Sequence, residues 1–121
     1  MSFSACNDKH NDIMNTEMTA QAVILKAQHL GARIRAARTR RGLRREDLAA
    51  KAGVSRSTLE KVERGDLGAA FGAYVKSLWA LGLDGELDLV ADPGLDRDGL
   101  ALELNAQSMR VRVQVPKDND F

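Results

Sequence analysis

Apolar residues recur at helical spacing along the first part of the chain. Between residues 19 and 41 they are separated by four, three, four and three positions, which places them on one helix face. They are Val23, Ala27, Leu30, Ile34 and Ala37. Gly42 follows, a residue type that ends helices, and arginines precede it near the negative end of the helix dipole. The pattern therefore predicts a first helix over residues 19–41.

Two shorter helices are predicted next, joined by a tight turn at Gly53, which can adopt the positive φ that such a turn needs. The first covers about residues 44–52 and carries two acidic residues in its first turn, where the helix dipole favours them. The second follows Ser55, a good N-cap residue, and stops at Gly65.

The two faces of this helix pair differ in chemistry. The apolar residues fall where two such helices pack together: Leu48, Ala49, Val54, Leu59 and Val62. The polar and basic residues fall where the second helix faces outward: Ser55, Arg56, Ser57, Thr58 and Lys61. This is the pattern of a helix-turn-helix, whose second helix lies in the major groove of DNA.

Two further helices are predicted before the pattern changes. Residues 69–81 carry an apolar face made of Phe71, Val75, Leu78 and Trp79. A short helix over residues 85–91 follows and is broken by Asp92-Pro93-Gly94.

The C-terminal segment has a period of two. Leu100, Leu102 and Leu104 alternate with other residues, and the alternation returns at Met109, Val111, Val113 and Val115. This pattern predicts strand. Because one or two strands are not stable alone in water, they are expected to pair with each other, with a second copy of the chain, or with a partner protein.

The predicted fold is therefore all-α: a five-helix DNA-binding domain with a C-terminal β-strand. Residues 1–18 are polar without a hydrophobic period and are expected to form a flexible tail. Residues 19–92 form the helix-turn-helix domain. Residues 93–121 are expected to form a strand-containing segment for dimerisation or partner binding, ending in a tail.

Charge divides the chain more sharply than its net value of +1 suggests. Residues 26–64 contain twelve Lys or Arg and four Asp or Glu, whereas residues 66–104 contain two basic and eight acidic residues. The basic half coincides with the helix-turn-helix, which favours binding to phosphate. The acidic half is either a docking surface for a basic partner or ordinary solvated surface, and its candidate residues are Glu86, Asp88, Asp92, Asp96 and Asp98.

The sequence predicts no catalytic, metal or cofactor site. Cys6 is the only cysteine, which excludes an intramolecular disulfide, and the two histidines are too few and too far apart to suggest a metal site. No glycine-rich phosphate loop or nucleophile–base set is visible. There is no apolar run near the ~18 residues of a membrane span, and no signal-peptide core. We therefore expect a non-enzymatic, cytoplasmic protein associated with the nucleoid.

The stretch LGARIRAARTRRGLRREDLAAKAGVSRSTLEKVERGD resembles the lambda-repressor-like helix-turn-helix domain of Xre-type regulators. The family pattern combines an arginine in the first helix, here Arg38, with a Leu-x-x-x-x-Leu-Ala segment, here residues 43–49. A Gly-Val-Ser segment ending in Glu-x-Gly follows, here residues 53–65. The resemblance covers about residues 28–83. It departs at residues 66–70, where many members have a proline and this chain has none.

The next stretch, FGAYVKSLWALGLDGELDLVADPGLDRDGLALE, looks like the sequence that follows the motif in HipB-like antitoxins. These are commonly paired with HipA-like Ser/Thr kinase toxins. The resemblance implies a DNA-binding repressor that regulates its own operon and acts as antitoxin to such a kinase. The alternative is a stand-alone Xre-type transcription regulator without a toxin partner. A DNA-independent interaction module would leave the basic recognition surface without an explanation.

The resemblance also implies which side chains contact bases. In the family, residues at the start of the recognition helix reach base edges, and the matching positions are Arg56, Ser57 and Lys61. Arg and Lys suit the O6 and N7 acceptors of guanine, so at least one G·C pair is expected in each half-site. The alternative is that Arg56 and Lys61 contact phosphates and carry no sequence information.

Further roles are expected around these positions. Arg44, Arg45, Ser55 and Thr58 are candidate contacts to the DNA backbone. Glu60 either accepts a hydrogen bond from cytosine or holds Lys61 or Arg64 in place. In the family, residues matching Arg38 and Glu63 form a partly buried ion pair between the first helix and the recognition helix.

A homodimer is expected because one domain offers too little base contact for specificity, whereas two copies read two half-sites about one helical turn apart. The candidate interface is the predicted strand, with Met109, Val111, Val113 and Val115. In HipB-like proteins a C-terminal strand is used in this way. The alternative is a hairpin within one chain, formed with residues 100–104.

Binding to duplex DNA is expected to depend steeply on salt. If the complex neutralises about six phosphates, counterion release lowers the affinity by roughly three decades between ~50 and ~200 mM salt. A titration of a labelled duplex followed by fluorescence anisotropy at several salt concentrations measures this slope. A flat salt dependence would contradict phosphate-driven binding.

Overall fold

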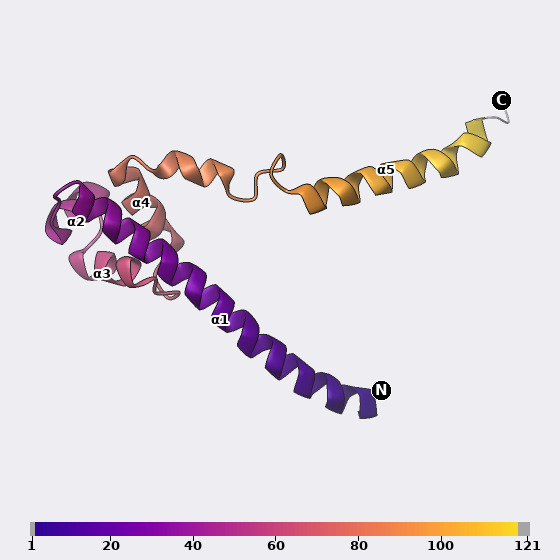
Figure 1. Ribbon diagram of the computed structural model, residues 1–121, viewed down its shortest axis with the longest axis horizontal. Helices are drawn as coiled ribbons and strands as arrows, with labels where there is room; N and C mark the ends of the chain where they lie inside the picture. Colours follow the sequence, from indigo (N-terminus) through magenta and orange to yellow (C-terminus); the bar gives the residue numbers. More distant parts are fainter. Residues whose placement is uncertain (1, 119–121) are drawn as a thin grey trace. The chain divides into compact units, whose positions relative to one another are not determined.

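The computed structural model describes the backbone of residues 2–118 and the side chains of residues 18–111. The described chain is helical and contains no strand. Its elements are α1 (Ser2–Arg40), α2 (Arg45–Ala52), α3 (Arg56–Arg64), α4 (Phe71–Leu81), the 3₁₀ helix η1 (Asp84–Leu89) and α5 (Arg97–Asp118) (Figure 1). They form two compact units, one up to Asp84 and one from Gly85 onward. None of the described helices is long and apolar enough to span a membrane.

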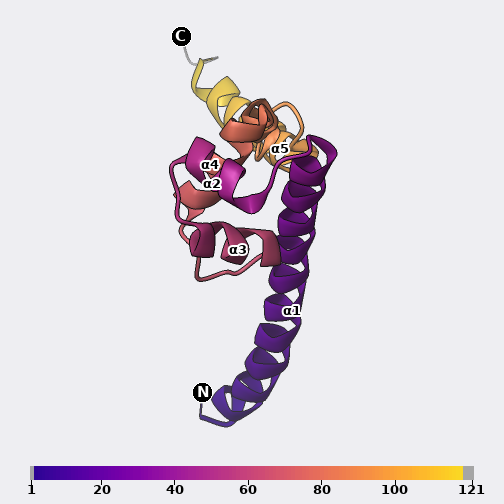
Figure 2. The same ribbon diagram turned by 90° about the vertical axis from the view of Figure 1, so that its left-hand side faces the viewer.

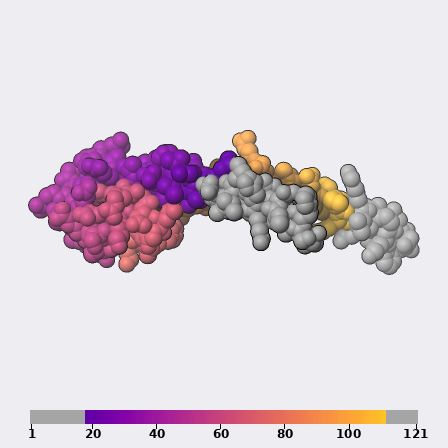
Figure 3. Space-filling model, turned by 90° about the horizontal axis from the view of Figure 1, so that it is seen from below, coloured from indigo at the N-terminus to yellow at the C-terminus, as the bar shows by residue number. Residues whose placement is uncertain are grey.

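In the N-terminal unit, four helices enclose one small core. Helix α1 packs chiefly along α3, and α2 packs against α3 and α4 (Figures 1 and 2). Three helices supply the largest fully buried apolar side chains, which are Ile34, Leu48, Leu59 and Val62. The surface view shows the atoms of α1, α3 and α4 in continuous contact (Figure 3). The aliphatic core predicted for the helix pair is thus largely confirmed.

Glycines end the two central helices where the sequence predicts it. Gly53 and Gly65 both have a φ of 73°, and each donates its backbone N–H to a carbonyl in the last turn of the preceding helix. Only glycine adopts this left-handed conformation without strain. The chain therefore turns sharply at the end of α2 and again at the end of α3, as a helix-turn-helix requires.

A close contact between α1 and the end of α3 has no signal in the hydrophobic pattern. A Cβ atom added to Gly31 would lie 2.5 Å from the Val62 carbonyl oxygen and 2.6 Å from the Gly65 nitrogen. A Cβ added to Gly65 would overlap the backbone of Ala27 and Gln28. The two glycines therefore allow the two backbones to touch.

The N-terminal segment differs from the prediction. The sequence predicts a helix from Thr19 after an irregular tail, whereas α1 already begins at Ser2. Residues 2–18 contain neither glycine nor proline, and extending an existing helix requires no new nucleation. The absence of an apolar period therefore did not exclude helix here.

The predicted C-terminal strand is wrong. Met109, Val111, Val113 and Val115 all lie within α5. A helix satisfies its backbone hydrogen bonds within one segment, whereas a strand needs a second strand beside it. Residues 100–110 also consist mostly of good helix formers, such as Leu, Ala, Glu, Gln and Met.

Three apolar side chains expected to be buried are exposed. The exposed fractions of Val23, Phe71 and Trp79 are 47%, 72% and 60%. On α4 the buried face consists instead of Ala73, Tyr74, Ser77, Leu78, Ala80 and Leu81. The short helix predicted over residues 85–91 is the 3₁₀ helix η1, which begins one residue earlier and ends two residues earlier, at Leu89.

Gly31→Ala is expected to destabilise the protein by about 2–3 kcal/mol, because backbone atoms cannot move aside for the new methyl group as a flexible side chain would. The matched control is Gly72→Ala on α4, where an added Cβ meets nothing within 4 Å. This control is expected to leave the stability unchanged or raise it by up to about 1 kcal/mol. Urea unfolding followed by circular dichroism measures both values. Equal stability of the two variants would contradict the close backbone contact.

Candidate nucleic-acid interface

The outward face of α3 carries the residues that the sequence assigns to DNA contact. Arg56, Ser57 and Lys61 are exposed and Thr58 is half-buried. The exposed Ser55 forms the N-cap, and its Oγ accepts a hydrogen bond of 3.1 Å from the Thr58 backbone N–H. The hydroxyl of Ser55 also donates to Thr58 Oγ1 at 2.8 Å. These contacts order the first turn of the helix and leave Arg56, Ser57 and Lys61 in solvent.

Arg44 begins α2 and is held by Asp47. The backbone N–H of Arg44 donates to Asp47 Oδ2 at 3.0 Å, and its Nε donates to the same oxygen at 3.3 Å. The backbone hydrogen bond, together with the side-chain one, lowers the pKa of the Asp47 carboxyl below its ordinary value. The side-chain hydrogen bond raises the pKa of Arg44. Arg44 is thus a fixed positive charge at the exposed start of α2.

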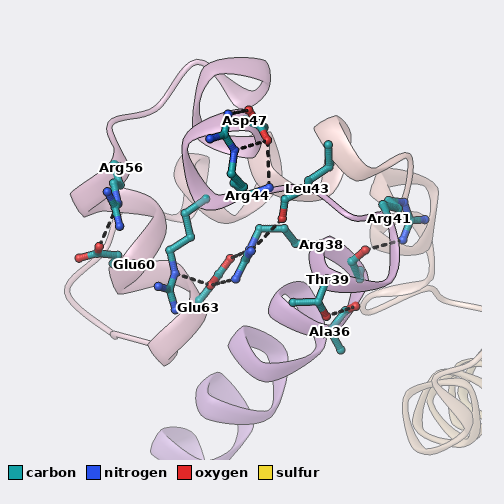
Figure 4. A network of polar contacts seen from close by, with 12 residues as sticks. Ala36, Arg38, Thr39, Arg41, Leu43, Arg44, Asp47, Arg56, Glu60 and Glu63 are labelled. Atoms are coloured by element: carbon teal, nitrogen blue, oxygen red, sulfur yellow. Dashed lines mark hydrogen bonds and ion pairs between the residues drawn. The ribbon is translucent and has the colours of Figure 1, made fainter.

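Glu63 is the centre of a buried polar network (Figure 4). Its carboxylate accepts from Arg38 Nε at 2.6 Å and from Arg38 Nη2 at 3.2 Å, in the bidentate geometry that favours arginine. Arg38 Nη1 donates to the Leu43 carbonyl at 2.9 Å. The exposed fractions of the two side chains are 8% for Arg38 and 3% for Glu63. The structure therefore brings the two residues together as a buried ion pair.

Arg45 completes this network. Its Nε lies 3.1 Å from Glu63 Oε1, and its side chain is 34% exposed. The sequence assigns Arg45 to the DNA backbone, but no sequence signal links it to Glu63, because the two are 18 positions apart. The residue thus ties α2 to α3, while one third of its surface faces solvent. It borders a groove of about 250 Å³ together with Arg35, Glu60, Glu63 and Arg64.

Arg56 is paired with carboxylates from two helices. Its Nη1 lies 2.9 Å from Glu46 Oε1 on α2, and its Nε lies 3.4 Å from Glu60 Oε1, one turn along α3 (Figure 4 shows the Glu60 pair). The expectation that Glu60 holds Lys61 or Arg64 is therefore wrong, since it contacts Arg56. The ion pair between Arg56 and Glu46 depends on the angle at which α2 and α3 cross, and the sequence pattern does not predict this angle.

The residues predicted for dimerisation lie in the C-terminal unit. Met109 and Val111 are exposed on α5, with exposed fractions of 65% and 57%. Val113 and Val115 lie within α5, and their side chains are outside the described residues. In the part of the chain that the structure describes, no group of three His, Cys, Asp or Glu residues is placed to hold a metal ion.

A comparison of the sequence with known protein families gives one match. Residues 29–89, half of the chain, match the family model described as "Helix-turn-helix domain". The matched segment contains the network around Glu63 and all the candidate DNA-contact residues. No curated protein and no solved structure gives a significant match.

Glu63→Ala is expected to lower the free energy of unfolding by about 3–5 kcal/mol, because it leaves the buried guanidinium of Arg38 without its partner. Glu60→Ala is the control on the same helix, because it removes only the ion pair between Glu60 and Arg56. The side chains of Arg56 and Glu60 are 58% and 39% exposed, so this variant is expected to lower the free energy of unfolding by less than about 1 kcal/mol. Urea unfolding of both variants checks the difference. A Glu63→Ala variant as stable as the parent would show that the pair does not hold the helices together.

Proposed function

Because the chain belongs to the helix-turn-helix family of DNA-binding regulators, we propose that it is a sequence-specific transcription repressor and a HipB-like antitoxin. It binds an operator with two half-sites as a homodimer and regulates its own operon. Its second partner is a HipA-like Ser/Thr kinase, which it neutralises.

The outward face of α3 is the observation that carries the DNA-binding part of the proposal. Arg56, Ser57 and Lys61 point away from the core on a helix whose other side is fixed by Leu59, Val62 and Glu63. A basic, exposed face on a rigid helix suits insertion into the major groove. Arginine and lysine at these positions suit guanine edges, while Arg44, Arg45, Ser55 and Thr58 lie around them as candidate backbone contacts.

The exposed apolar residues of α5 support dimer formation. Within the C-terminal unit, Leu100, Leu102, Leu104, Met109 and Val111 are each about half exposed or more. A helix with this much apolar surface in water is stabilised when a second helix covers it. We propose that α5 of a second copy does so, in place of the strand pairing that the sequence suggested.

The antitoxin role rests on the resemblance of residues 71–103 to HipB-like proteins and on the acidic charge of this part of the chain. Glu86, Asp88, Asp96 and Asp98 are exposed and Asp92 is half-buried. An exposed acidic surface is complementary to a basic partner. The same charge keeps this part of the chain away from phosphate, which is what a stand-alone regulator also requires.

Affinity capture of the tagged full chain from its native cells tests the proposal. We expect the DNA upstream of its own gene and a stoichiometric HipA-like kinase in the bound material. An Arg56→Gln, Lys61→Gln variant, which changes only exposed side chains, is expected to lose the DNA and retain the kinase. Sedimentation equilibrium is expected to give a dimer for the full chain and a monomer after deletion of residues 106–121.

Each part of the proposal can fail separately. Captured DNA without the kinase would leave a stand-alone regulator. Captured kinase without enriched DNA would contradict the repressor. A truncated protein that remains a dimer would exclude residues 106–121 of α5 as the main interface.

A further inference from the structure

Arg56 is not free in the absence of DNA. Glu46 on α2 and Glu60 on α3 lie 2.9 and 3.4 Å from its guanidinium nitrogens. All three side chains are partly solvated, with exposed fractions of 58% for Arg56, 46% for Glu46 and 39% for Glu60. The carboxylates therefore occupy the donors that a DNA oxygen would use, at positions that DNA can also reach.

This arrangement is local to the start of α3. Glu46 also lies 3.9 Å from Arg44, which is itself held by Asp47 at 3.3 Å. Two guanidinium groups are thus surrounded by three carboxylates. In contrast, within the described residues Lys61 has no carboxylate within 4.0 Å, although it lies on the same helix. Arg56, the predicted base-contacting arginine, is therefore paired with carboxylates, whereas Lys61 is not.

A DNA phosphate and a guanine edge differ in the contacts that they offer Arg56 in place of its two carboxylates. A phosphate offers one more anionic contact of the kind already present, while its charge is repelled by the nearby Glu46 and Glu60. A guanine edge offers two neutral acceptors in the geometry of the guanidinium, with little such repulsion. The repulsion from Glu46 and Glu60 therefore penalises exchange to a phosphate more than exchange to a guanine edge.

We propose that Glu46 and Glu60 determine specificity by restraining Arg56, so that it engages a guanine edge and does not strengthen binding to arbitrary DNA. This inference rests on the proposed DNA-binding function. Neither glutamate has to touch DNA, and both act through Arg56 as positioning residues.

The salt dependence of binding provides a readout that a merely structural role would not change. When a paired arginine moves to a phosphate, the counterion released from the phosphate is offset by a cation taken up by the vacated carboxylate. Arg56 then adds little to the salt slope of the parent protein. Without the carboxylates it contributes the full value for one phosphate, about 0.9 in the slope of log affinity against log salt.

The test compares Glu46→Gln, Glu60→Gln and the double variant with the parent. Two probes are used: a labelled duplex of random sequence, and a duplex that the parent protein selects from a random pool. The matched control is Glu86→Gln, Glu103→Gln, which makes the same charge change at two exposed glutamates of the C-terminal unit, outside α2 and α3. Melting curves confirm that each variant is folded.

We expect affinity for the random duplex at ~50 mM salt to rise about two- to fivefold for each pair removed, in line with the strength of exposed ion pairs. The salt slope of the double variant should be steeper by about 0.9. The affinity for the selected duplex should rise less than the affinity for the random duplex. The specificity, which is the ratio of the selected to the random affinity, should therefore fall.

Two results would overturn the inference while leaving the DNA-binding function intact. One is a double variant that behaves like the Glu86→Gln, Glu103→Gln control. The other is an equal gain for both duplexes, which would reflect net charge alone. A parent protein that selects no duplex from the pool would instead contradict the proposed function itself.

Discussion

One buried carboxylate organises the N-terminal unit. Glu63 accepts hydrogen bonds from Arg38 on α1 and from Arg45 on α2, while Arg38 also reaches the Leu43 carbonyl in the loop between those helices. Three helices therefore meet at the Glu63 side chain, and the loop joins them through Arg38. The isolated charges would be very unfavourable in a small apolar core, and bidentate geometry together with the second arginine offsets much of their desolvation. The network thus fixes the orientation of α3 by directional contacts, beside the packing of Leu59 and Val62 in the apolar core.

Much of this arrangement could be predicted from the sequence, because local rules dictate it. Glycines at 53 and 65, the N-cap Ser55 and the alternation of Leu59 and Val62 with polar residues specify two helices and the turn between them. The same pattern assigns Arg56, Ser57 and Lys61 to the outside of α3. The family match over residues 29–89 supports the helix-turn-helix itself.

The contacts that depend on helix crossing could not be predicted. The pairs Glu46–Arg56 and Arg45–Glu63 join residues 10 and 18 positions apart on different helices, and the approach of Gly31 to Gly65 has no hydrophobic signal. The period of two also gave a wrong prediction at the C-terminus, where alternating Val and Arg suggested a strand. The segment expected to pair with it within one chain, residues 100–104, lies in the same helix α5. The hydrophobic pattern thus predicted the type of element correctly where capping residues agreed with it, as in α2 and α3. It failed at the C-terminus, where no capping residue supported it.

The placement of Glu63 in the last turn of α3 has a consequence for how such a domain can evolve. The helix is anchored at its C-terminal end, where Val62, Glu63 and Gly65 contact α1 and α2, while the side chains that face solvent lie mainly in its first two turns. Substitutions at Ser57 or Lys61 leave the anchoring contacts in place, and a substitution at Arg56 removes only its exposed pairs with Glu46 and Glu60. The unit can therefore change these side chains at little cost in stability.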